Sequence, residues 1–288
     1  MGKIFDALEK ANKEEPIPAP HEKYPELVRT LSDKSGSDKF GFDKFGSNKS
    51  DILIKDTETE NNNRIIDENI IVYAESDSME AEQFKMLRTN ILFPVSGQPP
   101  RSILVTSAMP GEGKSFVAAN LAVSIARNIN EHVLIIDCDL RKPCLHTRFG
   151  YKNVQGLSEY LSRNIPLASL LLKTKIEKLT LLPGGKIPDN PSELLSSEVM
   201  KKMLIEVRER YKDRIIIIDS PPPQLTAETN VIARQVDGIL IVVKYGGTKR
   251  EMVAEMTTKL GKEKVLGVVF NWLSKRATSY YGYGKYGK

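Results

Sequence analysis

The sequence predicts an α/β fold, a mostly parallel sheet with helices on both faces. Two observations support this prediction. The chain alternates between short, fully apolar runs and stretches with helical periodicity. Continuous apolar runs of this kind are typical of parallel strands that are covered by helices on both sides. The second observation is a glycine-rich loop that stands between one such run and an apolar helix.

The glycine-rich loop reads Ala-Met-Pro-Gly-Glu-Gly-Lys-Ser and occupies residues 108–115. It follows a β-branched run at 103–106 and opens a helix at 116–126. Its glycines allow backbone N–H groups to converge, and the helix N-terminus adds partial positive charge. This context predicts a phosphate-binding loop rather than an ordinary glycine turn. Lys114 is expected to contact the β- and γ-phosphates of a nucleotide, and Ser115 to hold Mg²⁺. The expected nucleotide-binding residues of the loop are Gly111, Glu112, Gly113, Lys114, Ser115 and Phe116.

Helices and strands follow one another along the rest of the chain. Asp77 as N-cap, with Glu80 three residues later, predicts a helix over 77–93. Later helical stretches are expected at 157–172, with a break near Pro166, then from Asn190 onward and up to Tyr211. The predicted strands after the loop lie at 133–136, 179–182, 215–218, 239–243 and 265–270.

Acidic residues follow two of the predicted strands. Asp137 and Asp139 come after the strand at 133–136, and Asp219 comes after four isoleucines at 215–218. Ligands of parallel sheets bind beyond the carboxyl ends of the strands, beside the predicted loop. A single carboxylate there is often a helix cap, but three beside a Gly-Lys-Ser loop indicate nucleotide chemistry.

Three carboxylates near a triphosphate would repel it, so a magnesium ion is implied. The predicted metal ligands are Ser115, Asp139 and Asp219. Asp137 and Asp139 are two residues apart, so in extended backbone both side chains point the same way. One of them can hold Mg²⁺ while the other accepts a proton from an incoming hydroxyl. The predicted catalytic residues are therefore Lys114, Asp137 and Asp139.

The composition limits the other possibilities. The chain has 288 residues, of which 40% are hydrophobic and 27% charged, enough for one α/β core with appendages. The net charge of +5 comes from interleaved acids and bases, so no nucleic-acid partner is expected. Two cysteines are too few for a disulfide framework. No apolar run is long enough to span a bilayer and no signal peptide is visible, so we expect a cytoplasmic protein.

Composition also suggests four regions. Residues 1–14 are expected to form an amphipathic helix, either a frayed terminus or a segment that docks on a partner or membrane surface. Residues 15–76, rich in Pro, Ser, Asp, Lys and Gly, are predicted to be a disordered linker. The catalytic domain is placed at 77–277. Residues 278–288 form a tail with candidate acceptor phenols or a merely adhesive aromatic end, with its tyrosines at Tyr280, Tyr281, Tyr283 and Tyr286.

Taken together, these motifs resemble one family. The chain is similar to the bacterial tyrosine autokinases (BY-kinases) of exopolysaccharide and capsule biosynthesis, and most of all to the stand-alone cytoplasmic kinases of exosortase-associated loci. The resemblance covers roughly residues 77–288, with the first ten residues as a further point of similarity. It is carried by the tyrosine-rich tail and by the motifs at 108–115, 134–141, 190–195 and 215–219.

The resemblance implies an ATP- and Mg²⁺-dependent protein-tyrosine kinase with a P-loop NTPase-like fold. It assigns Lys114 and Ser115 to ATP and Mg²⁺, the three aspartates to catalysis and metal binding, and Asn271 to the adenine. The tail tyrosines become acceptors that another copy phosphorylates. The family's oligomer motif is matched by Glu82, Lys85 and Arg88, with a lysine where the family has arginine, although periodicity alone would make this row a solvated surface.

The resemblance also implies partners. These are a ring-like homo-oligomer, a transmembrane polysaccharide co-polymerase that sets chain length, and a protein-tyrosine phosphatase. The chain would then be cytoplasmic and peripheral to the inner membrane through its partner. It would regulate exopolysaccharide polymerisation and export by autophosphorylation.

Two rival functions remain open from the sequence. A partition- or division-site ATPase of the same superfamily would carry an extra lysine at the position of Met109, and the tyrosine tail also argues against it. A kinase-dead, nucleotide-binding scaffold would lack part of the phosphate site, whereas every predicted residue of that site is present.

Overall fold

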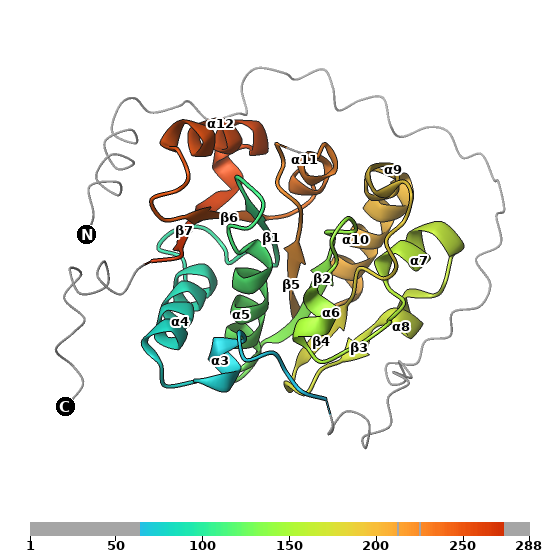
Figure 1. The fold of residues 1–288 in the computed structure, drawn as a ribbon, viewed down its shortest axis with the longest axis horizontal. Helices are drawn as coiled ribbons and strands as arrows, with labels where there is room; N and C mark the ends of the chain where they lie inside the picture. Colours follow the sequence, from blue (N-terminus) through green and yellow to red (C-terminus); the bar gives the residue numbers. More distant parts are fainter. Residues whose placement is uncertain (1–63, 212, 225, 274–288) are drawn as a thin grey trace, which may run out of the picture. The chain divides into compact units, whose positions relative to one another are not determined.

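A sheet of seven strands forms the centre of the part of the chain that the structure describes, residues 64–211, 213–224 and 226–273. This computed structural model orders the strands β3-β4-β2-β5-β1-β6-β7, and all neighbours are parallel except β3 and β4 (Figure 1). The predicted fold class is therefore confirmed for these residues. The strands are β1 Ser102–Ser107, β2 His132–Asp137, β3 Leu172–Lys173, β4 Leu179–Leu182, β5 Arg214–Asp219, β6 Gly238–Lys244 and β7 Val265–Asn271.

Helices connect the strands and cover both faces of the sheet (Figure 1). The predicted break near Pro166 is confirmed, because Asn164 adopts a left-handed conformation between two short helices. Four short or late helices, α3, α6, α11 and α12, were not predicted. The helices are α3 Ile71–Ala74, α4 Met79–Leu92, α5 Lys114–Ala126, α6 Leu145–Arg148, α7 Leu157–Arg163, α8 Leu167–Leu170, α9 Pro191–Leu195, α10 Glu198–Arg210, α11 Glu228–Ala233 and α12 Arg250–Leu260, with a 3₁₀ turn at Lys262–Lys264.

Two apolar cores lie on opposite faces of the sheet. In β2, Val133 and Ile135 pack into the core that contains α3, α4 and α5. Leu134 and Ile136, which alternate with them, pack into the core under α7, α10, α11 and α12. This alternation is the pleat of a strand buried on both sides, and it explains the absence of polar residues from the strand interior. Polar side chains therefore gather at the strand ends, where Asp137 of β2 pairs in register with Asp219 of β5.

The domain begins earlier than the sequence predicted. Ile70 is fully buried and Val72 nearly so, and α3 packs against α5, so residues 64–76 are part of the domain rather than of a linker. The N-cap of α4 is also corrected. It is Ser78, whose hydroxyl accepts a hydrogen bond from the backbone N–H of Ala81, and not Asp77. The segment 64–76 (called the strap below) was placed in the linker although about half of its side chains are apolar, because they show neither a helical nor an alternating spacing.

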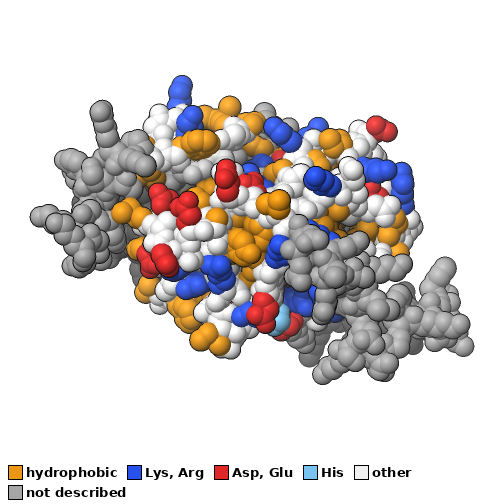
Figure 2. Space-filling view, turned by 60° about the horizontal axis from the view of Figure 1, so that its bottom comes forward, with side chains coloured by type: hydrophobic (Ala, Val, Ile, Leu, Met, Phe, Trp, Pro, Cys, Tyr) orange, Lys and Arg blue, Asp and Glu red, His pale blue; other side chains and the backbone are white. Residues whose placement is uncertain are grey.

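The surface shown in Figure 2 carries basic and acidic side chains side by side, as their interleaving along the sequence suggests. Among the described helices, none combines the length and the hydropathy that a bilayer crossing requires. The predicted helix at 1–14, most of the predicted linker and the tyrosine tail lie outside the described residues.

Candidate active site

The glycine-rich loop links the end of β1 to the start of α5, as predicted. Gly111 and Gly113 adopt positive φ angles of 81° and 96°, a conformation that side chains with a Cβ rarely accept. Gly113 is also the N-cap of α5. A Cβ at this position would lie 2.0 Å from Nδ2 of Asn271, at the end of β7. Glycine is thus required here both for the turn and for the close approach of the last strand.

Hydrogen bonds from side chains stabilise this loop. The Oε2 atom of Glu112 accepts a hydrogen bond from the N–H of Met109 at 2.8 Å, and its Oε1 atom accepts one from the Thr248 hydroxyl. Asn271 donates from Nδ2 to the backbone carbonyl of Glu112 at 2.9 Å. Glu112 is only 4% exposed, so its side chain supports the loop from within the fold.

Lys114 joins the loop to two of the predicted aspartates. Its Nζ atom lies 2.7 Å from Oδ2 of Asp139 and 3.9 Å from Oδ1 of Asp219. It also donates to the Ser115 hydroxyl at 3.2 Å. Burial by itself lowers the pKa of Lys114, but the two carboxylates outweigh it and raise this pKa above its usual value. Lys114 therefore stays protonated and carries a positive charge between the loop and the strand ends.

Asp137 is fully buried and held by backbone N–H groups. Its Oδ2 atom accepts from Cys144 at 2.9 Å and from Leu145 at 3.0 Å, at the start of α6, and its Oδ1 atom accepts from Asp139 at 3.2 Å. Burial, reinforced by the Asp219 carboxylate, raises the pKa of Asp137 to about 7. A carboxyl group with such a pKa can exchange a proton near neutral pH.

Asp219 is equally buried, but neither of its carboxylate oxygens has a hydrogen-bond partner among the described residues. Burial raises its pKa, while the ammonium of Lys114 opposes that shift. A buried carboxylate without hydrogen bonds is costly to maintain. Such a group is typical of a site that is completed by a cation.

The residues around Lys114 fit a magnesium ion better than a metal held by protein alone. Within the described ranges, no three His, Cys, Asp or Glu side chains converge as a ready-made metal site. Magnesium in phosphate-transferring enzymes is bound by one or two protein oxygens, with phosphates and water completing its shell. The free oxygens of Asp219 and the hydroxyl of Ser115 meet that requirement.

Other predicted residues have different surroundings. The ring of Phe116 packs edge-on against Phe84, with centroids 5.8 Å apart, and is partly buried against the core. On α4, Lys85 pairs with Glu82 at 3.0 Å. Arg88 donates to the Ser124 carbonyl at 2.9 Å and is thereby engaged within its own chain. The four acceptor tyrosines lie outside the described residues.

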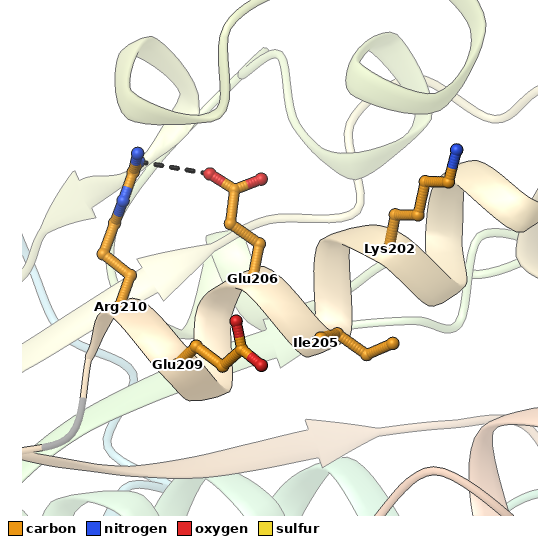
Figure 3. A pocket seen from close by; sticks show the side chains of 5 residues that line it. All are labelled: Lys202, Ile205, Glu206, Glu209 and Arg210. Carbon is orange, nitrogen blue, oxygen red and sulfur yellow. Dashed lines mark ion pairs between the residues drawn. The ribbon is translucent and has the colours of Figure 1, made fainter. Parts of the chain in front are cut away.

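One polar cluster beside the site was missed by the sequence reasoning. Arg141, four residues after Asp137, contacts Glu228 and Ser192. The spacing of Arg141 in its motif was a usable signal, but Glu228 stands in a stretch without any recognisable pattern. By contrast, a groove along the exposed side of α10 contains none of the predicted residues (Figure 3).

A parallel sheet, a glycine-rich loop that opens a helix, and acidic groups at the adjacent strand ends define the class of P-loop nucleotide-binding proteins. Comparison with known proteins gives the same class. Residues 101–263 match the family described as AAA domain. The tyrosine-protein kinase YwqD of Bacillus subtilis is 38% identical over 221 residues, which are 76% of this chain and 91% of that protein.

Solved structures agree with this relation. The chimerical protein CapA2B2 is 33% identical with a TM-score of 0.66, over 73% of this chain and 93% of the other. The kinase domain of the Escherichia coli tyrosine kinase ETK is 29% identical with a TM-score of 0.67, over 75% and 84%. The chain belongs to the bacterial tyrosine-protein kinases, as its motifs predicted. Its reaction is phosphoryl transfer to protein tyrosine, and the ATPase and scaffold alternatives are not supported.

Proposed function

We propose that this chain binds ATP and Mg²⁺ at the glycine-rich loop and phosphorylates the tail tyrosines of another copy. The observation that carries the proposal is the position of Lys114, whose Nζ atom lies 2.7 Å from Asp139 and 3.9 Å from Asp219. A cation between two carboxylates at the mouth of a P-loop can turn to a phosphate when a nucleotide arrives. The backbone N–H groups of the loop and the start of α5 then bind the phosphates.

The chain's own groups account for each step. Ser115, Asp139 and Asp219 hold the magnesium ion, which when bound neutralises charge on the phosphates. Asp137 accepts the proton of the tyrosine hydroxyl, since its pKa of about 7 suits a general base. The bond between the γ-phosphorus and the bridging oxygen of ATP breaks as the phenol oxygen bonds to phosphorus. The products are ADP and phosphotyrosine.

The acceptors that we propose are Tyr280, Tyr281, Tyr283 and Tyr286, which alternate in part with glycines near the C-terminus. A mixing experiment tests transfer between copies. One protein carries Lys114→Met and an intact tail; the other carries an intact site and four Tyr→Phe substitutions in the tail.

We expect each variant alone to be free of phosphotyrosine and the mixture to contain it, on the Lys114→Met chain only. Phosphotyrosine on Lys114→Met protein alone, purified from a host without tyrosine kinases, would place the active site elsewhere. An intact wild-type signal combined with a silent mixture would mean transfer within one chain.

The same proposal extends to assembly and location. We infer that the row Glu82, Lys85 and Arg88 contributes to an interface in a ring-like oligomer. The helix predicted at 1–14 is our candidate attachment point for a transmembrane polysaccharide co-polymerase. A phosphatase would reset the tail. The family resemblance supports these partners, and control of exopolysaccharide export follows from them. Reversing the charge of Lys85 should lower the mass measured by light scattering; an unchanged mass would exclude this row from the interface.

A further inference from the structure

Three loops at the carboxyl end of the sheet meet at one buried carboxylate. Arg141 comes from the segment after β2, Ser192 from the first turn of α9, and Glu228 from the start of α11. The Nε atom of Arg141 lies 3.3 Å from Oε1 of Glu228, and its Nη2 atom donates to the Ser192 hydroxyl at 2.7 Å. That hydroxyl donates to Oε2 of Glu228 at 3.0 Å. We call this cluster the three-loop clasp.

The side chains of the clasp differ in their exposure to solvent. The side chain of Glu228 is fully buried, whereas that of Arg141 is 49% exposed. A buried carboxylate is tolerated only when it is paired and hydrogen-bonded. Arg141 forms the ion pair with Glu228, and the Ser192 hydroxyl donates a hydrogen bond to the second carboxylate oxygen. The segment that carries Arg141 is therefore linked to the first turns of α9 and α11.

That segment also carries the predicted catalytic groups, since Asp137, Asp139 and Arg141 are alternate residues. In the structure, Asp139 is held by the ammonium of Lys114 at 2.7 Å and by the N–H of Lys142 at 3.1 Å. If Lys114 turns to the phosphates, as proposed above, Asp139 loses its ionic partner at the moment when it must bind the metal. The clasp, two residues away, does not depend on Lys114.

We propose that Arg141 is a positioning residue, which keeps Asp139 in place for the magnesium ion once Lys114 has moved to the nucleotide. This inference rests on the proposed roles of Lys114 and Asp139. It assigns a function to an arginine that touches neither the loop nor the predicted metal ligands in the structure. The clasp is therefore needed for magnesium-dependent steps and not for nucleotide contact with the loop.

The test compares two binding measurements and one rate in the full-length chain. A fluorescent ATP analogue is titrated in EDTA, and the Mg²⁺ concentration that gives half of the magnesium-dependent gain in affinity is then measured. In Arg141→Ala we expect the affinity in EDTA to stay within about 3-fold, the half-saturating Mg²⁺ concentration to rise about 10-fold, and tyrosine phosphorylation to fall by about 10- to 100-fold. Arg141→Lys should lie between, because a lysine cannot bridge both partners.

A matched control is Arg210→Ala. Arg210 has a similarly exposed side chain, 51%, and pairs with Glu206 at 3.3 Å on the outer side of α10, as Figure 3 shows. Exposed pairs of this kind contribute little to stability. All three measurements should match the wild-type protein in this variant.

A second variant separates positioning from simple neutralisation of Glu228. Glu228→Gln removes the buried charge, so the double variant Arg141→Ala with Glu228→Gln should fold even if the single variant does not. We expect its half-saturating Mg²⁺ concentration to remain about 10-fold high. Recovery of the wild-type value would overturn the proposal, as would an unchanged value in Arg141→Ala. Loss of binding in EDTA by Lys114→Met tests the proposed function separately, and its absence would refute that function rather than the clasp.

Discussion

The ends of β2 and β5 carry the same residue in two different environments. Asp137 and Asp219 pair in register on adjacent strands, and both are fully buried. Asp137 accepts three backbone hydrogen bonds, two of them from the start of α6. Asp219 accepts none among the described residues, and the ammonium of Lys114, 3.9 Å away, offsets its charge in part.

The difference shows which carboxylate is held by the fold and which is free for a ligand. Backbone N–H groups fix the orientation of Asp137 and satisfy its charge in part, whatever occupies the site. Asp219 keeps its coordination capacity free, at a cost to stability. Asp137 is thus held in place by the backbone, whereas Asp219, which we propose as a metal ligand, has no hydrogen bond among the described residues.

The largest expected effect is on activity when Asp219 is neutralised. Asp219→Asn keeps the shape but removes the charge that we assign to the metal, so tyrosine phosphorylation should fall by at least about 100-fold. The midpoint of thermal unfolding should not fall, because a costly buried charge is lost. A rate near that of the wild-type protein would show that Asp219 has no part in the metal site.

A smaller effect separates the two aspartates by stability. Asp137→Ala leaves two buried N–H groups and one part-buried N–H group without this acceptor, while Asp219→Ala removes no hydrogen bond among the described residues. Asp137→Ala should therefore be the less stable variant by about 1–3 kcal/mol. Urea unfolding at pH 7.5 without nucleotide measures this. Equal stability, or the reverse order, would mean that the hydrogen bonds of Asp137 contribute little.

The smallest effect is a dependence on pH. As a base, Asp137 must be deprotonated, so kcat/KM for MgATP, which reports the free enzyme, should fall about 10-fold per pH unit below pH 7. Because its pKa is raised on folding, the folded state binds more protons than the unfolded state between about pH 4 and 7. The contribution of Asp137 to the free energy of unfolding therefore decreases as pH rises through this window and is constant above it. Asp137→Ala lacks this contribution, so its free energy of unfolding should fall less, or rise more, than that of the wild-type protein as pH increases through the window. An identical pH dependence in the two proteins would contradict the raised pKa.

The sequence predicted the sheet and the loop well because both depend on local patterns. Fully apolar strands and a Gly-Lys-Ser turn before a helix are contiguous in the chain, and the three aspartates follow directly from strand ends. The clasp could not be predicted in the same way. Arg141, Ser192 and Glu228 are far apart in sequence and meet only through the order of the strands.

Orientation was the other property that the sequence did not determine. Glu112 and Phe116 are among the predicted nucleotide-binding residues, yet their side chains contact other parts of the protein, Glu112 the N–H of Met109 and Phe116 the ring of Phe84. The strap at 64–76 was assigned to the linker because its apolar side chains follow no regular period, although two of them, Ile70 and Val72, are buried. Such choices depend on which neighbour each side chain meets, which is a property of the tertiary structure.

The contact between Asn271 and the carbonyl of Glu112 places the last described strand at the rim of the nucleotide loop. Tyr280 follows Asn271 by nine residues, so a fully extended connection covers at most about 32 Å. The tyrosines that we propose as acceptors are thus joined by a short connection to a strand that contacts the same chain's glycine-rich loop. The connection is long enough for a tyrosine to reach the site of its own chain. A preference for the tyrosines of a neighbouring chain must then come from the direction in which the tyrosine enters the site.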